Sequence, residues 1–366
     1  MCDNKYVINL SDVVYNFDTA KSLAGSAGVI PVLKAAGYGM GAKKIADTLF
    51  KARGVPLFAV SRLDEALELK SGDYEVLVLS PVFNEQSAKA AVLNNFITAV
   101  SSVQSAYLLN AAAKGLGAVA RAHIALDTGF GRYGFTPDNA EQIMGLKDFD
   151  NIKITGVYSH LYAAFDKDAK KSLNQLSAFT AITQRLEAQY GPLTKHIANS
   201  SAVAKRLNPF MLDAVRIGSM LCGRLPFNSG CNLRPVGTLC CPITQIKELP
   251  RGHNIGYGGI FSLKRASRVA VINAGSADGI LRTKGYDTFR PVDFMRYGYN
   301  IVKMLFKDNR LKFEINGKKA PVLGRVALTN TMLDVTDIDC KAGDIAALKI
   351  SPLAVDKSIK REYINE

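Results

Sequence analysis

The sequence predicts an α/β protein in which a (β/α)8 TIM barrel is followed by a mainly β C-terminal domain. The chain has 366 residues, which exceeds the size at which one hydrophobic core usually stops growing, so two domains are expected. Short apolar runs alternate with segments of helical period up to about residue 220. After Pro226 the helical period disappears, and runs rich in Val and Ile follow one another with turn signals between them.

Eight apolar segments are expected to form the barrel strands, with helical patterns between them, as at 41–54 and 166–190. In chain order these segments are 29–35, 56–60, 75–80, 96–100, 119–127, 152–160, 195–199 and 213–219. Eight strand–helix units are typical of a (β/α)8 barrel. A doubly wound open sheet has the same periodicity and stays open as the alternative.

The second domain is expected to consist of strands joined by hairpins. Its apolar runs are PITQIKEL, SRVAVINAG, KFEINGKKAPV and DIAALKI, and Asn316–Gly317 stands where a tight hairpin turn would form. The expected boundaries are 9–228 for the barrel and 229–366 for the β domain, and a strand within 1–8 is expected to join the β domain.

The formal net charge of +14 is high, but the basic residues are spread along the chain, as at Lys43–Lys44, Lys318–Lys319 and Lys360–Arg361. No dense basic tract or aromatic–basic RNA motif stands beside them, so we expect a solvated surface and no nucleic-acid partner. No apolar run approaches the roughly 20 residues of a transmembrane helix, so no membrane association is expected.

The cysteines and histidines are expected to be neither disulfide-bonded nor metal-binding. Six cysteines are dispersed without a C-x-x-C pair, which suits reduced thiols. The four histidines, His123, His160, His196 and His253, form no H-E-x-x-H motif or zinc cluster. The N-terminal segment lacks a basic stretch followed by an apolar run, so we expect no secretory signal and a cytoplasmic location.

The segment VLKAAGYGMGAKKIADTL places Lys34 at the carboxyl end of the first expected barrel strand. Barrel enzymes place their chemistry at that end of the strands. A lysine there is commonly only a solvated strand end, but the glycines at 37, 39 and 41 would let the backbone approach a ligand closely. Lys34 is therefore a candidate for chemistry.

The segment DTGFGRYGF (127–135) contains a Gly-x-Gly-x-x-Gly match. A dinucleotide fingerprint belongs after the first strand, with an acidic residue ending the next one. Here the match follows the fifth strand, and the next strand ends in Ser159–His160. We therefore interpret this segment as a loop that carries Arg132 at the barrel mouth.

The segments HIANSS and VRIGS end the seventh and eighth expected strands, where barrels commonly bind phosphate through backbone N–H groups and hydroxyls. Ser200, Gly218 and Ser219 have the chemistry for this, with ordinary turns as the alternative. Taken alone, a histidine at a strand end, such as His160, is more often structural than catalytic, and an isolated Gly-Tyr-Gly, as at Tyr257, is usually a loop.

Taken in chain order, nine fragments resemble those of the alanine racemase family. They are INLSDVVYNF, VLKAAGYGMG, LDTGFGRYGF, GVYSHL, HIANSSA, AVRIGS, IGYGG, SADGILR and GRVALTNTMLDVTD. One such fragment would be weak evidence, whereas nine in register are highly specific. The resemblance covers nearly the whole chain and implies a fold-type III pyridoxal-phosphate amino-acid racemase, an isomerase.

The resemblance implies that pyridoxal 5'-phosphate is held as a Schiff base on Lys34 and that a small amino acid is racemised through an aldimine. Racemisation removes the α-proton from one face of a plane and returns a proton to the other, so two bases must flank the plane. Lys34 would serve one face. Tyr257 of a second subunit would serve the other, which implies a homodimer.

The resemblance also implies the other site residues. His160, Arg216 and Arg132 would supply the positive field that a tyrosine base needs near neutrality. Arg216 would contact the pyridine nitrogen, and Arg132 would face the phenolic oxygen of the cofactor and the substrate carboxylate. The backbone N–H of Leu328 would meet that carboxylate. The implied cofactor-binding set is Lys34, Tyr38, Arg132, His160, Asn199, Ser200, Arg216, Gly218 and Ser219.

Four departures from the family pattern lie at the pocket mouth or its supports. Ala125 stands where the family commonly has a carbamylated lysine that steers the arginine. Ser276 replaces a tyrosine that narrows the substrate entrance, and Leu328–Thr329 replaces Met-Asp. The C-terminal Asn-Tyr-Glu stretch is not evident in ISPLAVDKSIKREYI.

These changes favour an altered or broadened substrate range, so a serine or broad-specificity racemase is the alternative to an alanine racemase. A decarboxylase of the same architecture and a non-catalytic protein that binds the same cofactor are the alternatives of another class. The chain lacks the Gly-Gly-Gly phosphate loop of such decarboxylases. The β domain and Tyr257 argue against a non-catalytic carrier.

Overall fold

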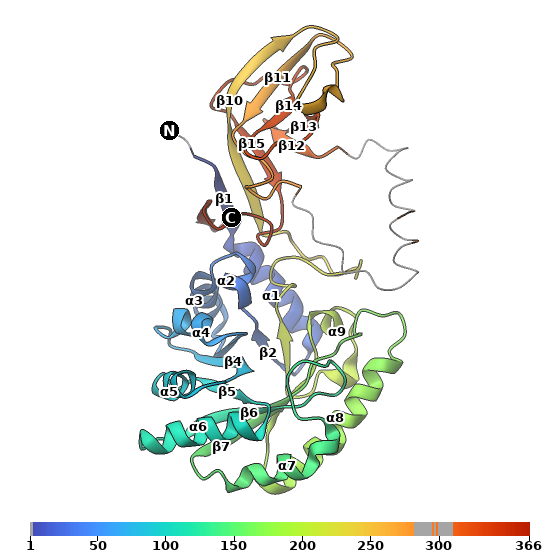
Figure 1. Cartoon of the computed structure of the whole chain (residues 1–366). Helices are drawn as coiled ribbons and strands as arrows, with labels where there is room; N and C mark the ends of the chain where they lie inside the picture. Colours follow the sequence, from blue (N-terminus) through green and yellow to red (C-terminus); the bar gives the residue numbers. More distant parts are fainter. Residues whose placement is uncertain (1–2, 282–294, 296–297, 299–309) are drawn as a thin grey trace. The chain divides into compact units, whose positions relative to one another are not determined.

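The computed structural model describes residues 3–281, 295, 298 and 310–366, and these form two compact units (Figure 1). The barrel unit comprises Asn9–Val236 and the last two residues of the chain. The β unit comprises the N-terminal residues up to Ile8 and Gly237–Ile364. The division falls after Val236, and the segment just before it hydrogen-bonds to the first helix of the barrel unit.

Eight parallel strands form the barrel, which confirms the predicted fold class. They are β2 (Gly28–Pro31), β3 (Leu57–Val60), β4 (Glu75–Pro81), β5 (Ile97–Val100), β6 (Ala120–Ala125), β7 (Ile152–Tyr158), β8 (Thr194–His196) and β9 (Ala214–Ile217). Their order is β2-β9-β8-β7-β6-β5-β4-β3, and a parallel bridge from Val32 to Ala59 joins its two ends. The strand order never reverses, which excludes the doubly wound alternative.

Helices follow or precede these strands in the barrel unit. They are α1 (Leu10–Ala24), α2 (Lys34–Tyr38), α3 (Ala42–Arg53), α4 (Leu63–Leu69), α5 (Glu85–Leu93), α6 (Val103–Gly115), α7 (Ala140–Met144), α8 (Lys170–Tyr190) and α9 (Ser200–Ala204), with 3-10 turns η1 (Pro137–Asn139), η2 (Gly145–Asp148) and η3 (Asn208–Phe210). None of the helices in the described part of the chain has the length and apolar character needed to cross a membrane.

Capping side chains explain where several helices begin. Asn84 and Ser102 have extended backbone before α5 and α6, and each accepts a hydrogen bond from the backbone N–H three residues later. The side chains of Ser87 and Ser105 return the bond, which completes two capping boxes. These side chains therefore fix the first residues of α5 and α6.

The barrel interior is filled by small and branched apolar side chains from successive strands. The cluster consists of Ile30, Val32, Ala59, Leu77, Ile97 and Ala214. Several polar side chains are also buried in this unit, and among them His123, His196 and Arg216 contact one another. Because a buried charge is costly unless it has partners, this polar group marks a part of the barrel that packing alone does not explain.

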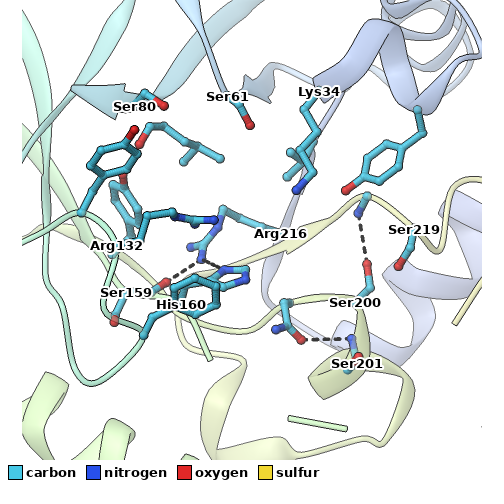
Figure 2. A pocket seen from close by; sticks show the side chains of 18 of the residues that line it. Lys34, Ser61, Ser80, Arg132, Ser159, His160, Ser200, Ser201, Arg216 and Ser219 are labelled. Carbon is cyan, nitrogen blue, oxygen red and sulfur yellow. Dashed lines mark hydrogen bonds between the residues drawn. The ribbon is translucent and has the colours of Figure 1, made fainter. Parts of the chain in front are cut away.

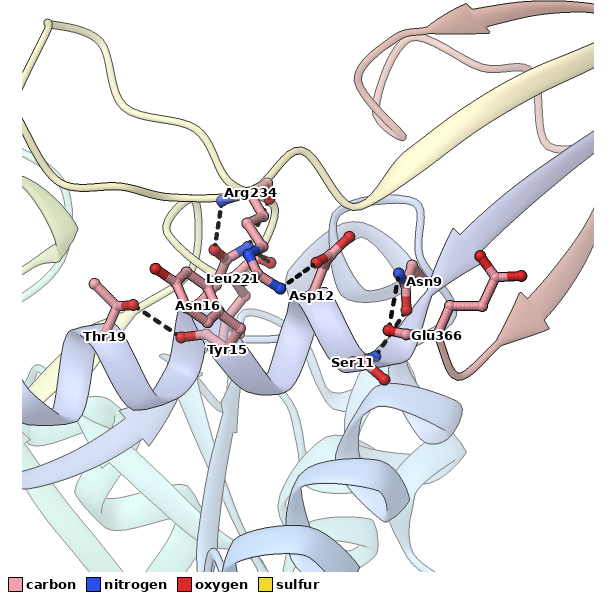
Figure 3. Close-up of polar contacts among 9 residues, drawn as sticks. All are labelled: Asn9, Ser11, Asp12, Tyr15, Asn16, Thr19, Leu221, Arg234 and Glu366. Carbon is pink, nitrogen blue, oxygen red and sulfur yellow. Dashed lines mark hydrogen bonds and ion pairs between the residues drawn. The ribbon is translucent and has the colours of Figure 1, made fainter.

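The first helix is tied to the end of the barrel unit by polar contacts (Figure 3). Asn9 caps α1, accepting a hydrogen bond from Ser11 N. The buried Asn16 donates to the carbonyls of Leu221 and Arg234 and accepts from Arg234 N. The Arg234 guanidinium pairs with Asp12 at 3.3 Å. These bonds fix the chain that leaves the last barrel strand.

The β unit is an antiparallel sheet with eight strands described. They are β1 (Lys5–Asn9), β10 (Gly237–Leu249), β11 (Ser267–Ile272), β12 (Lys312–Ile315), β13 (Lys318–Leu323), β14 (Thr331–Asp334), β15 (Ile345–Lys349) and β16 (Lys360–Ile364). β10 pairs with β1, β15 and β11. Asn316 and Gly317 join β12 to β13 with φ of 49° and 75°, which confirms the predicted hairpin turn.

Candidate active site

A cavity of about 430 Å³ opens at the carboxyl ends of the barrel strands. All nine residues predicted to bind the cofactor line it: Lys34, Tyr38, Arg132, His160, Asn199, Ser200, Arg216, Gly218 and Ser219. Figure 2 shows the Lys34 amine and the Arg216 guanidinium in this cavity, with Arg132 next to Arg216 and with Ser200 and Ser219 on the opposite side of the view. The barrel topology thus gathers segments that are far apart in the sequence.

Lys34 begins a turn of unusual conformation. Ala35, Ala36, Gly37 and Tyr38 all have positive φ, between 52° and 63°. Left-handed conformation is rare for residues that carry a side chain, and its occurrence at consecutive positions is rarer still. Burial lowers the pKa of the Lys34 amine, Arg132 lowers it further, and Glu65 opposes the two effects.

Arg216 is held by acceptors on two strand ends. Its Nη1 contacts His196 Nδ1 at 2.6 Å and donates to the carbonyl of His196 at 2.8 Å. Its Nη2 donates to the carbonyl of Ser159 at 2.5 Å and lies 3.4 Å from His160 Nδ1. A guanidinium can only donate, so both imidazoles must present an unprotonated nitrogen to it. No carboxylate pairs with Arg216 among the described residues.

His123 extends the series of hydrogen bonds that begins at Arg216 and passes through His196. His196 Nε2 and His123 Nδ1 are 2.9 Å apart. Because His196 Nδ1 accepts from Arg216, its Nε2 carries the proton and donates to His123. Burial, together with the nearby Arg216 charge, lowers the pKa of His123 to about 4, and the same two causes lower the pKa of His160 to about 3. Neutral histidines therefore surround the cation.

The loops after β8 and β9 meet at a close contact. Ser200 Oγ accepts a hydrogen bond from Gly218 N at 3.1 Å. A Cβ atom added to Gly218 would lie 2.2 Å from the Tyr38 hydroxyl, so only glycine fits there. Asn199 caps α9 by accepting from Ser201 N and Ala202 N, and it donates to Leu161 O. The Asn199 side chain therefore shapes the loop, whereas the hydroxyl groups of Ser200 and Ser219 line the cavity.

The glycine-rich loop after β6 folds around Asp127. The carboxylate of Asp127 accepts hydrogen bonds from Gly129 N and Gly131 N. Arg132 follows in the same loop, and its guanidinium carbon lies 4.5 Å from the centre of the Phe130 ring. Within the described residues Arg132 has no hydrogen-bonded acceptor, so its charge is free to bind an anion in the cavity.

The comparisons with known proteins decide the family. The sequence profile of the alanine racemase N-terminal domain matches residues 8–226, and that of the alanine racemase C-terminal domain matches residues 236–359. The alanine racemase of Clostridium novyi strain NT is 33% identical over 347 residues, covering 92% of this chain and 83% of that protein. The chain belongs to the alanine racemase family.

Solved structures of the alanine racemase family share the fold. The alanine racemase of Clostridium difficile 630 has a TM-score of 0.85 and 24% identity, covering 100% of this chain and 97% of that one. The alanine racemase of Bartonella henselae with covalently bound pyridoxal phosphate has a TM-score of 0.77 and 23% identity, covering 100% of both chains. The decarboxylase and non-catalytic alternatives are not favoured by these comparisons.

Ala125, which departs from the expected family pattern, is buried beside Ala99 and Tyr158 in a small apolar cluster. The Phe130 ring meets His160 edge-on, with ring centres 5.0 Å apart, and Arg132 lies over the same Phe130 ring. Phe130 therefore contacts both the Arg132 guanidinium and the His160 ring.

The two remaining predicted site residues lie in the β unit. Tyr257 begins the 3-10 turn η4 (Tyr257–Gly259), between Gly256 and Gly258 with φ of 78° and 76°, and 77% of its surface is exposed. Leu328 is 68% exposed, and its carbonyl accepts from Ala277 N, next to Ser276. Two family departures, Ser276 and Leu328, are thus neighbours. The predicted contribution of Tyr257 to the site stays a prediction.

Sequence reasoning missed several residues that shape this alanine racemase cavity. His123 and His196 were weighed only as isolated histidines, and nothing in their spacing predicts that they contact one another. Tyr158 stacks on the His196 ring at 5.2 Å and donates to Leu79 O. Glu65 stands three residues after the N-cap residue Arg62, and because arginine is not among the residues preferred at an N-cap, the sequence gives no clear capping signal there.

The cavity holds no cluster typical of a metal site. Across the described residues, no group of three or more His, Cys, Asp or Glu side chains is arranged to hold a metal ion.

Proposed function

We propose that the protein is a pyridoxal 5'-phosphate-dependent amino-acid racemase that interconverts L- and D-alanine. Its curated relatives bear the name alanine racemase and cover most of the chain. The observation that carries the proposal is the single cavity that combines the Lys34 amine, the clamped Arg216 guanidinium and a hydroxyl-bearing loop.

The cavity residues fit pyridoxal phosphate. The hydroxyls of Tyr38, Ser200 and Ser219, together with the close-packed Gly218, would hold the phosphate group. Lys34 would hold the cofactor covalently. Arg216 would donate to the ring nitrogen and, because a guanidinium does not accept protons, would keep that nitrogen unprotonated. When bound, this cofactor withdraws electrons from an attached amino acid and so acidifies its α-proton.

Lys34 and Tyr257 would move the proton at the α-carbon. The lowered pKa of the Lys34 amine increases the fraction that is neutral and able to accept a proton near neutral pH. The exposed Tyr257 of a second copy would donate to and accept from the opposite face. Arg132 and the backbone N–H of Leu328 would hold the substrate carboxylate, and His160 would stand beside Arg216.

We also propose a homodimer that acts in the cytoplasm. A second copy is required by the mechanism if Tyr257 serves a neighbour, and the exposure of both Tyr257 and Leu328 suits residues that become covered on association. Among the described residues the five cysteines Cys222, Cys231, Cys240, Cys241 and Cys340 are free thiols, which suits a reducing compartment.

The test is proton exchange at the α-carbon. The protein with pyridoxal phosphate is incubated with L-alanine in D2O, and both deuteration and D-alanine are measured. We expect both, with no product from Lys34→Ala and at least a roughly hundredfold slower reaction for Tyr257→Phe. Lys51→Ala and Tyr107→Phe are the exposed controls. Absence of D-alanine from the loaded wild-type protein would refute the proposal.

Serine is a second candidate substrate. The hydroxyls of Ser61 and Ser80 line the cavity, and neither has a hydrogen-bond partner among the described residues. A substrate hydroxyl could bond to them, and Ser276 adds another small polar side chain in the β unit. The measurement is kcat/KM for L-alanine and L-serine, in the wild type and in Ser61→Ala. A selective loss for serine supports this candidate, and strict alanine preference excludes it.

A further inference from the structure

Glu65 is a buried carboxylate directly behind the Lys34 turn. It is the third residue of α4, and only 6% of its surface is exposed. Its carboxylate accepts three backbone hydrogen bonds, from Ala35 N at 2.6 Å, from Ser61 N at 2.9 Å and from Arg62 N at 3.1 Å. A buried carboxylate needs such donors to remain charged.

The two oxygens of the Glu65 carboxylate accept hydrogen bonds from different segments of the chain. Oε2 accepts from Ser61 and Arg62, and these bonds complete the N-terminal cap of α4. The cap would be satisfied by Oε2 alone. Oε1 instead accepts from Ala35, the residue that follows Lys34. The helix cap therefore does not explain the contact to the Lys34 turn.

The hydrogen bond from Ala35 N to Glu65 holds a turn whose backbone conformation is unfavourable. Ala35 and Ala36 have left-handed backbone with φ of 52° and 53°, which is unfavourable for alanine. Strained backbone persists only where the surroundings over-determine it, and it concentrates at functional sites. The bond to Ala35 N is charge-assisted and short, so it is stronger than a neutral hydrogen bond.

We propose that Glu65 is a positioning residue for Lys34: its carboxylate anchors the left-handed turn so that the amine projects into the cavity, and its negative charge offsets the positive charge of Arg132 at that amine. The proposal rests on the proposed function, in which Lys34 carries the cofactor and acts as a base. Glu65 touches neither substrate nor cofactor, and it acts through the backbone of Ala35 and through its field.

The opposing effects of Arg132 and Glu65 on the Lys34 amine lead to a prediction that would not follow if Glu65 had only a structural role. Burial and Arg132 lower the pKa of the Lys34 amine, and Glu65 raises it. Removing the charge of Glu65 should therefore lower the pKa of Lys34 further, so that the amine becomes reactive at lower pH. Glu65→Gln removes the charge but keeps an oxygen, whereas Glu65→Asp keeps the charge but shortens the side chain.

The first measurement is the pH dependence of covalent labelling of the Lys34 amine by an amine-reactive acylating reagent, read by peptide mass spectrometry in the full-length protein without cofactor. Glu65→Gln should move the labelling midpoint to lower pH, and Glu65→Asp should move it less. Glu68→Gln, an exposed carboxylate of the same helix, should not move it. An unchanged midpoint in Glu65→Gln contradicts the proposed field.

The second measurement is racemisation by the cofactor-loaded enzyme. Both Glu65→Gln and Glu65→Asp should lower kcat by about tenfold to a hundredfold with little change in KM, because the base is displaced rather than removed. Adding Ala36→Gly should restore part of the loss, since glycine adopts positive φ freely and needs less anchoring. Wild-type kcat in both Glu65 variants contradicts the anchoring role.

These readouts separate the inference from the proposed function. If the loaded wild-type protein forms no D-alanine, the proposed function fails, while the labelling midpoint still tests the field of Glu65. If Glu65→Gln does not fold, the same measurements on Glu65→Asp and on Glu65→Gln with Ala36→Gly decide between the outcomes. Failure of Ala36→Gly to restore either folding or kcat contradicts the anchoring of the turn.

Discussion

Arg216 shows how a cation is kept inside a barrel with no carboxylate partner among the residues that the structure describes. Two backbone carbonyls and the ring nitrogens of His196 and His160 surround its guanidinium, and only 4% of its surface is exposed. Burial lowers its pKa to about 10, so it stays protonated near neutral pH. The histidines around Arg216 must remain neutral, because a second positive charge buried beside the guanidinium would be repelled.

Stability should therefore fall in mild acid. The folded-state pKa of His123 is about 4, against an ordinary value of 6.5, so the unfolded chain binds more protons between these values. Stability is complete above about pH 6.5 and declines toward pH 4, by about 1.4 kcal/mol per pH unit for this histidine and on the order of 3 kcal/mol in all. Urea unfolding at several pH values measures the slope.

The control for this acid effect is a variant in which His123 no longer titrates. His123→Gln should lower the pH slope, although it is less stable at neutral pH. The exposed His253→Gln should leave the slope unchanged. An equal slope in wild type and His123→Gln would show that other groups cause the acid sensitivity.

Gly218 should tolerate no side chain. A methyl group there would meet the Tyr38 hydroxyl at 2.2 Å, so Gly218→Ala must displace either Tyr38 or the loop that donates to Ser200. We expect the dissociation constant for pyridoxal phosphate to rise by about tenfold or more, the equivalent of losing one good hydrogen bond. Absorbance titration with the cofactor measures it.

The matched control is Gly115→Ala at the end of α6. No atom lies within 4 Å of a Cβ added to Gly115. The cofactor affinity of Gly115→Ala should equal that of the wild type. Equal affinity in Gly218→Ala as well would mean that phosphate is not bound at this loop.

At the scale of elements, the parallel barrel explains why the site forms. The residues that follow β2, β6, β7, β8 and β9 line the same cavity, because the carboxyl ends of parallel strands lie at one end of a barrel. These loops and strand ends contribute different functional groups to the cavity, namely an amine, guanidinium groups, an imidazole and hydroxyl groups. The helix α1 is held to the chain after β9 by Asn16, so it keeps the last of these loops in place (Figure 3).

Asn16→Leu should destabilise the barrel unit without changing its chemistry. The substitution leaves the carbonyls of Leu221 and Arg234 and the N–H of Arg234 without their partner. We expect the free energy of unfolding to fall by about 3 kcal/mol, because buried polar groups without partners are costly. Thr19→Val, which removes only a bond within α1, should cost about 1 kcal/mol or less. Similar urea midpoints for the two variants would argue against this anchor.

At the scale of the whole molecule, the two units carry different predicted residues. Lys34 and the phosphate loops belong to the barrel unit, and Tyr257 and Leu328 belong to the β unit. If Tyr257 serves the barrel of a second copy, an active site needs one part from each of two chains. Activity would then depend on association rather than on one chain alone.

Mixing two inactive variants tests this arrangement. In a heterodimer of Lys34→Ala and Tyr257→Phe, one site has both mutations and the other has neither, so an equal mixture should regain about a quarter of the wild-type activity after exchange. Each variant alone should stay near its own low activity. If Tyr257 acts on the barrel of its own chain, mixing restores nothing, which would overturn the donated tyrosine.

Much of the fold was predictable because its signals are local. Eight apolar segments separated by helical patterns predicted the barrel strands, and the Asn316–Gly317 turn predicted its hairpin, since strand and turn preferences depend on neighbouring residues. The nine family fragments located Lys34, Arg132 and the phosphate loops in order. These are features of short stretches of chain.

The sequence by itself determined the family, the barrel with its β domain and the residue types available at each strand end. Only the tertiary structure decided which of them meet. The contact of His123 with His196, the hydrogen bond from Ala35 N to Glu65 and the contact of Phe130 with His160 join strands and loops that sequence spacing does not relate. Proton positions and charge balance depend on such distances, and distances between separate segments are set by packing.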